Sequence, residues 1–125
     1  MKVILLIGTA GFIGTLTRYI CVRLINHLAP GFPWGTLAVN IAGAFLAGFF
    51  FLLCRLKLQA YEEYFPVLLI GFLGAFTTFS TFALESARFL EDAQYCKFIA
   101  NVLLQNSTGI FAAFLGMYLA KIIFR

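Results

Sequence analysis

The chain has 125 residues, of which 62% are hydrophobic and only 11% are charged, and its mean hydropathy is +0.97. A soluble domain of this size leaves much of its surface exposed and could not hide so many apolar side chains, so the composition indicates an integral membrane protein. The net charge is +4, but the basic residues stand near the ends of apolar runs, as snorkelling and topology charges do, which argues against a nucleic-acid partner.

Four apolar runs predict an all-α integral membrane protein, and they leave no room for a second domain within residues 1–125. The expected transmembrane helices cover about residues 3–25, 34–53, 64–84 and 98–120. Two prolines and a glycine at 29–33 predict a turn between the first two helices. A polar loop at 55–63 and a connection at 86–97 are expected to join the remaining helices.

The first span carries Arg18 on the same side as three of its glycines. This arginine either snorkels to the membrane surface or attracts anions at the mouth of a pore. The chain has one histidine and three scattered cysteines. Such a set does not form a metal-binding cluster, and we do not expect an enzyme.

The second span has small and polar residues at three- and four-residue spacing, which places them on one helix face: Thr36, Asn40, Gly43, Ala44 and Ala47. The amide of Asn40 needs partners in lipid, and it either bonds a neighbouring helix or lines a pathway. The fourth span likewise has polar residues on one face, to which we assign no role: Asn101, Gln105 and Thr108.

The third span is unusual for a lipid-spanning helix, because two glycines and four hydroxyls lie in it: Gly71, Gly74, Thr77, Thr78, Ser80 and Thr81. Polar, glycine-rich backbone at membrane depth is tolerated only where protein or a water-filled passage satisfies it. Glycine-interrupted hydrophobic segments are typical of substrate or ion sites. We therefore expect a permeation pathway along this span.

An aromatic stripe runs along the same span if its helix is continuous: Phe72, Phe76, Phe79 and Phe82. Such a stripe usually serves packing, but aromatic rings have positive edges and hydroxyls can donate hydrogen bonds. A path of hydroxyls, an amide and ring edges suits a small anion, whereas cation pathways more often carry carboxylates.

The charge pattern at the helix ends predicts the topology. Four spans put both termini and the 55–63 loop on one side, with five Lys and Arg residues against four on the other. Because the orientation of a membrane protein follows this bias, a balanced chain should insert in both directions. An antiparallel, dual-topology homodimer then becomes possible.

Three blocks of this sequence resemble the Fluc (CrcB-like) fluoride channels over essentially the whole chain. These blocks are residues 10–19, residues 35–40 with Gly43 and Gly48, and residues 71–82 with Glu85. The third block, in which TTFSTF follows GFLG, is highly specific.

The resemblance implies a dual-topology dimer with two fluoride pores and a third helix that breaks at its middle. Asn40 would line each pore, and Phe79 and Phe82 would turn their ring edges toward the ion. Hydroxyls of Thr78, Ser80 and Thr81 would lie nearby. The backbone carbonyls of Gly74 and Thr77 would help to hold a structural sodium ion between the subunits.

The implied activity is passive, selective efflux of toxic fluoride across a prokaryotic cell (inner) membrane. Pairing with an unlike subunit instead of a second copy remains an alternative, as some family members require it. Two other functions stay open at this point: a small dual-topology exporter, and an assembly protein without transport activity.

Overall fold

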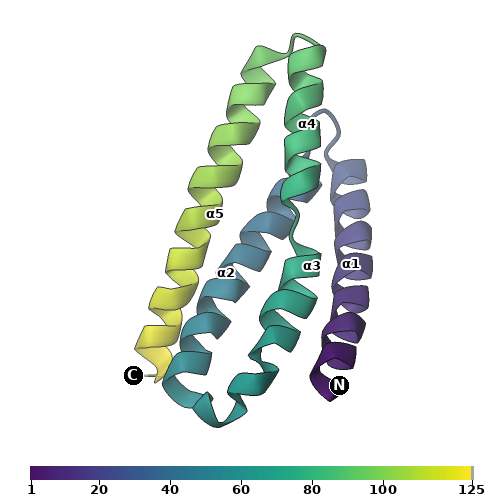
Figure 1. Cartoon of the computed structure of the whole chain (residues 1–125). Coiled ribbons are helices and arrows are strands. Elements are labelled where there is room, and N and C mark those ends of the chain that lie inside the picture. Colours follow the sequence, from purple (N-terminus) through teal and green to yellow (C-terminus); the bar gives the residue numbers. More distant parts are fainter. Residues whose placement is uncertain (125) are drawn as a thin grey trace.

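The computed structural model describes residues 1–124 and is helical throughout, with no strand in that range (Figure 1). Its elements are α1 (Lys2–Leu28), α2 (Trp34–Lys57), η1 (Gln59–Tyr64), η2 (Val67–Leu73), α3 (Gly74–Phe76), α4 (Phe79–Glu91) and α5 (Tyr95–Phe124). Four stretches are long and apolar enough to cross a membrane: Lys2–Leu28, Trp34–Lys57, Gln59–Glu91 and Tyr95–Phe124. The all-helical fold with four spans is therefore confirmed.

The helices run alternately up and down, so the two chain ends and η1 lie at the same end of the bundle (Figure 1). They are longer than the expected spans, and most of residues 86–97, predicted as a connection, is helical. This part of α4 is amphipathic, with Ser86 buried and Phe89 half-buried. The Phe89 ring stacks on Phe32, with the centroids 6.0 Å apart, and this packing stabilises the helix beyond its apolar part.

Helices α2 and α5 pack closely against each other, and two glycines allow this approach. A Cβ atom added at Gly48 would collide with the carbonyl oxygen of Ala113, and one at Gly116 would collide with that of Phe45. Small residues at such positions let two helix backbones come together, which is a main source of helix association in lipid.

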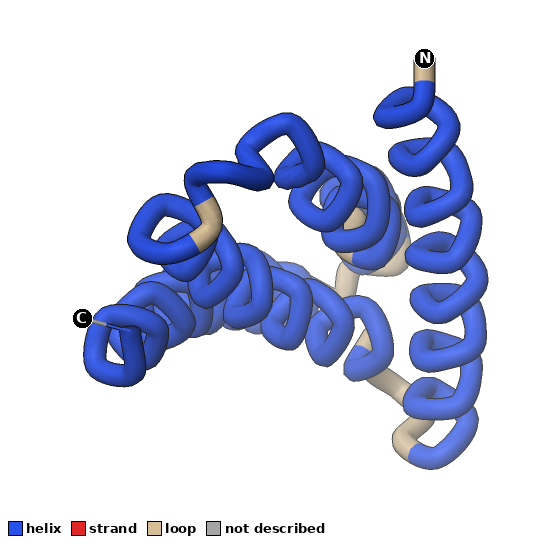
Figure 2. The backbone as a smooth tube through the Cα atoms, turned by 90° about the horizontal axis from the view of Figure 1, so that it is seen from below, coloured by secondary structure: helices blue, strands red, loops and turns tan. Residues whose placement is uncertain are grey.

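Helix α1 packs on η2 and α3, on the side of the third span that faces away from α5 (Figures 1 and 2). A Cβ atom added at Gly71 would lie only 2.9 Å from the carbonyl oxygen of Ile7, so the two backbones are close here as well. The third span thus packs on α1, while α1 also contacts α2 directly and α4 contacts α5.

The third span is not one continuous helix. Its first part, η2, has the wide hydrogen-bonding pattern of a π-helix, which often occurs at functional sites. The backbone then becomes extended at Thr77 (φ −90°, ψ 160°) and Thr78 (φ −151°, ψ 121°) before α4 begins. We refer to Thr77 and Thr78 as the break.

The break divides the expected aromatic stripe into two pairs. Phe72 and Phe76 stack before the break, with centroids 5.8 Å apart and planes at 5°. Phe79 and Phe82 follow the break and meet at 5.5 Å and 64°, edge toward face. A single stripe was expected only for a continuous helix, and the two extended residues interrupt the helix between the pairs.

Candidate functional site

The start of α4 gathers the hydroxyls of the third span. Thr78 caps this helix, and its Oγ1 accepts a hydrogen bond from the backbone N–H of Thr81 at 3.1 Å. The same hydroxyl lies 3.0 Å from Thr81 Oγ1 and 3.3 Å from Ser80 Oγ. A helix start carries partial positive charge, so this cluster favours anions nearby.

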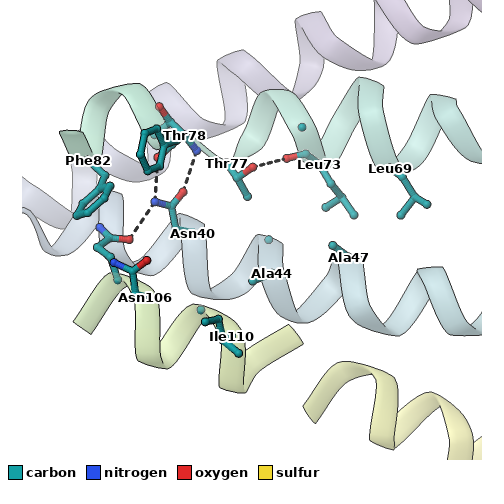
Figure 3. Close-up of a pocket in the computed structure, with 15 residues that line it drawn as sticks. Asn40, Ala44, Ala47, Leu69, Leu73, Thr77, Thr78, Phe82, Asn106 and Ile110 are labelled. Atoms are coloured by element: carbon teal, nitrogen blue, oxygen red, sulfur yellow. Dashed lines mark hydrogen bonds between the residues drawn. The ribbon is translucent and has the colours of Figure 1, made fainter. Parts of the chain in front are cut away.

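Asn40 on α2 satisfies the backbone of the break. The N–H of Thr78 donates to Asn40 Oδ1 at 2.8 Å, and Asn40 Nδ2 donates to the Thr78 carbonyl at 3.0 Å (Figure 3). A carboxamide has the same donor and acceptor as a peptide group, so this side chain supplies the acceptor that the Thr78 N–H lost and adds a second donor to the Thr78 carbonyl, which as N-cap also accepts within α4. Extended backbone can then persist within an apolar span.

Gln105 on α5 holds the Asn40 amide from the other side. Asn40 Nδ2 donates its second hydrogen to Gln105 Oε1 at 3.0 Å. The Gln105 side chain is buried, and its Nε2 has no hydrogen-bond partner within residues 1–124. Both amide hydrogens of Asn40 are therefore engaged in the isolated chain.

Arg18 on α1 reaches the same point, where its Nη1 donates to the Thr77 carbonyl at 3.3 Å. The break is consequently bonded to α1 through Arg18, to α2 through Asn40 and, through Asn40, to α5. The Arg18 side chain is half-buried and turned toward the break, so in the single chain it contacts protein backbone.

A cavity of about 400 Å³ lies beside the break (Figure 3). It is lined from α2, the third span and α5 by Asn40, Gly43, Ala44, Ala47, Leu69, Leu73, Gly74, Thr77, Thr78, Phe79, Phe82, Gln105, Asn106, Gly109 and Ile110. We call it the amide cavity. The Phe79 ring is 77% exposed in the single chain, whereas Phe82 is only 9% exposed.

A second cavity of about 480 Å³ lies on the α1 side of the break. We call it the arginine cavity, and it is lined by Thr15, Arg18, Tyr19, Val22, Arg23, Thr78 and Thr81. Thr78 lines both cavities, so it is shared by the amide cavity and the cavity that carries two guanidinium groups.

The break also changes the hydrogen bonding of Gly74. In a continuous helix the N–H of Thr78 would donate to the Gly74 carbonyl, but it donates to Asn40 Oδ1 instead. Gly74 is exposed in the single chain. Its carbonyl is therefore free to bind another group, as backbone carbonyls at interrupted helices do for cations.

The structure brings together most of the residues that the sequence singled out. Asn40, Gly74, Thr77, Thr78, Phe79 and Phe82 line the amide cavity, and Arg18 and Thr81 line the arginine cavity. Ser80 is exposed and meets the others only through Thr78. Thr108 donates to the Leu104 carbonyl of its own helix and lies apart from the site.

Two further polar pairs continue the site along α4, and the α4 partners in them, Glu85 and Ser86, were not predicted from the sequence. Thr36 donates to Glu85 Oε1 at 2.6 Å, and Asn101 Nδ2 donates to Ser86 Oγ at 3.0 Å. The spacing places Thr36 four residues before Asn40, and Asn101 four residues before Gln105. Each residue therefore shares the helix face of the amide that follows it.

Residues 5–117 match the model of a protein family described as "CrcB-like protein, Camphor Resistance (CrcB)". Curated relatives named "Fluoride-specific ion channel FluC" include one from Nitrosococcus oceani, which is 42% identical over 118 residues, and one from Solidesulfovibrio magneticus, which is 44% identical over 118 residues. A third, from Desulforapulum autotrophicum, is 41% identical. Each alignment covers 94% of this chain and 94% of the relative.

Proposed function

This chain belongs to the CrcB-like protein family, and from that membership we propose that it is a fluoride-selective ion channel. Its relatives are named as ion channels and not as enzymes. The proposed activity is passive efflux of toxic fluoride through the inner membrane of a prokaryotic cell, in which the chain is a multi-pass protein.

The observation that carries this proposal is the lining of the amide cavity. It combines carboxamides, hydroxyls and the rings of Phe79 and Phe82, and no carboxylate is among its described lining residues. Rings of this kind offer positive edges, and amides and hydroxyls are donors by type, all of which are partners for an anion. In the single chain both Asn40 hydrogens are already engaged. Cation pathways more often carry carboxylates, and none is among these described lining residues.

The arginine cavity supplies a route of approach. Arg18 and Arg23 raise the local concentration of anions next to Thr78. A small anion gives up its water only where other partners compensate. The hydroxyls of Thr78, Ser80 and Thr81 and the edges of Phe79 and Phe82 are proposed to provide those partners.

The proposal includes an antiparallel homodimer. The amide cavity is open in the single chain, and Phe79 and Gly74, which line it, are exposed. A second copy packed against this side would enclose the cavity and complete a pore. The nearly balanced charges at the two ends of the bundle permit the opposite orientations that such a dimer needs.

A structural sodium ion between the two copies is also part of the proposal. The free Gly74 carbonyl fits a hard cation, and the Thr77 carbonyl has a second lone pair beside its bond from Arg18. When bound, the ion would add positive potential next to the pores. The nearby guanidinium group opposes a cation at Thr77, so Gly74 is expected to contribute more.

The test is anion efflux from liposomes that contain the purified single chain. A fluoride channel should release fluoride and not chloride when a potassium ionophore compensates the charge, and empty liposomes serve as the control. Proton-coupled uptake of an organic cation would instead indicate an exporter, and absence of all flux would support an assembly protein or a need for an unlike subunit.

A further inference from the structure

The amide of Asn40 has no hydrogen left for an ion. Its Oδ1 accepts from the Thr78 N–H, and its two Nδ2 hydrogens go to the Thr78 carbonyl and to Gln105 Oε1. An anion could take one of these hydrogens only if the break or Gln105 released it. Gln105 therefore holds one of the two Asn40 hydrogens, and the Thr78 carbonyl holds the other.

The orientation of both amides follows from this pattern. Asn40 must turn its oxygen toward the Thr78 N–H and its nitrogen toward the Thr78 carbonyl, because a flipped amide would place donor against donor. Asn40 Nδ2 then faces Gln105, which must offer its oxygen. The Gln105 Nε2 is then not the atom that meets Asn40, and it is buried without a partner within residues 1–124.

A buried amide at position 105 lowers the stability of the protein, so its presence there indicates a function. Gln105 is only 8% exposed, it lies in an apolar helix, and a buried amide nitrogen without a partner loses its hydration. An apolar side chain of similar size would pack there without this cost. The one hydrogen bond that the side chain forms is the bond that fixes Asn40.

We propose that Gln105 is a positioning residue for anion conduction, which acts by accepting a hydrogen bond from Asn40 and so holding the break in its extended form. This inference rests on the proposed channel function. The break sets where α4 begins, and with it the position of the Phe79 ring at the amide cavity. Without Gln105, Asn40 can rotate away from Thr78 and the wall of the cavity loses its fixed shape.

The test is a double-mutant cycle of Asn40→Ala and Gln105→Met in the full-length chain. Methionine keeps the length and burial of the side chain and removes its acceptor. Gln59→Met, the same substitution at an exposed residue on η1, is the matched control. Fluoride efflux, chloride efflux and the unfolding temperature are measured on all of these proteins.

Gln105→Met is expected to lower fluoride efflux about tenfold and to lower the ratio of fluoride to chloride efflux, while Gln59→Met matches the wild type. In the Asn40→Ala background the same substitution should change efflux less than about twofold, because residues that act through one another are not additive. The unfolding temperatures should show the same non-additivity. They still measure the coupling of the two residues if the efflux of Asn40→Ala falls to background.

Wild-type efflux in Gln105→Met would overturn the proposal, and so would additive losses, which would indicate that Gln105 meets the ion independently of Asn40. A lower fluoride efflux with an unchanged ratio of fluoride to chloride efflux would also overturn it. That result would indicate only that a smaller amount of the channel is folded. These results leave the channel function intact. The proposed function itself is tested separately, by the fluoride efflux of the wild-type chain.

Discussion

The side chain of Asn40 replaces a peptide group of the helix at Thr78. Its Oδ1 accepts the Thr78 N–H at 2.8 Å, and its Nδ2 donates to the Thr78 carbonyl at 3.0 Å. The two residues are 38 positions apart in the chain, so a contact between helices decides the local backbone. The same contact leaves the Gly74 carbonyl without its helical donor, which links the amide cavity to the proposed cation site.

Removal of the Asn40 amide should therefore affect stability as well as conduction. Asn40→Ala leaves the N–H of Thr78 unpaired, and an unsatisfied buried group costs about 1–3 kcal/mol. The Thr78 carbonyl, as the N-cap carbonyl of α4, keeps its intrahelical hydrogen bond. We expect a clearly lower unfolding temperature and a fluoride efflux reduced by at least about tenfold. Thermal unfolding in detergent and liposome efflux measure the two effects.

Asn106→Ala is the control for stability, because Asn106 is exposed and its amide donates to the Val102 carbonyl of its own helix. It should unfold at nearly the wild-type temperature. If Asn40→Ala also unfolded at the wild-type temperature, the hydrogen bonds to Thr78 would not hold the break.

The close packing of α2 on α5 gives a second prediction. Gly48→Ala places a methyl group against the Ala113 carbonyl, so the helices must move apart at a cost of about 1–3 kcal/mol. Gly8→Ala is the matched control, since a Cβ atom there meets nothing within 4 Å. Only Gly48→Ala should lower the unfolding temperature, and equal temperatures for both variants would contradict the packing described for these helices.

Part of this architecture could be predicted from the sequence because it depends on local patterns. Hydropathy and length located the four spans, and four-residue spacing placed Thr36 with Asn40 and Asn101 with Gln105 on common faces. Helix periodicity alone determines which residues share a face. It does not determine which other helix that face contacts.

The rest could not be read from a single span because it depends on contacts between spans. The residue at which the third span breaks is fixed by Asn40, and the contact of Arg18 with Thr77 depends on where α1 packs. The phenylalanine stripe required an unbroken helix, and the break at Thr77 and Thr78 removes that condition. The partner of Gln105 likewise became visible only when α2 and α5 were placed side by side.

The orientation of the chain in the membrane gives a third prediction. Gln59 is exposed on η1, at the same end of the bundle as both termini (Figure 1). In a background without the three native cysteines, Gln59→Cys should react with a membrane-impermeant thiol reagent on about half of the chains from either side, as balanced topology charges imply. Modification from one side only would contradict dual topology.

The last prediction concerns Phe79 and Phe82, whose rings meet edge toward face beside the amide cavity. If they only pack, replacement by isoleucine keeps an apolar side chain and typically costs less than about 1.5 kcal/mol. Phe79 is 77% exposed in the single chain and Phe82 is 9% exposed, so any loss of stability should be larger for Phe82→Ile.

If the ring edges contact the ion, the same substitutions remove their positive rim and leave aliphatic carbon facing a partly dehydrated anion. We expect Phe79→Ile and Phe82→Ile to give folded protein with fluoride efflux reduced by at least about tenfold, which corresponds to about 1.4 kcal/mol on the barrier. Phe114→Ile, on an exposed face of α5, should match the wild type. Wild-type efflux in both cavity variants would assign the two rings to packing and remove them from the conduction mechanism.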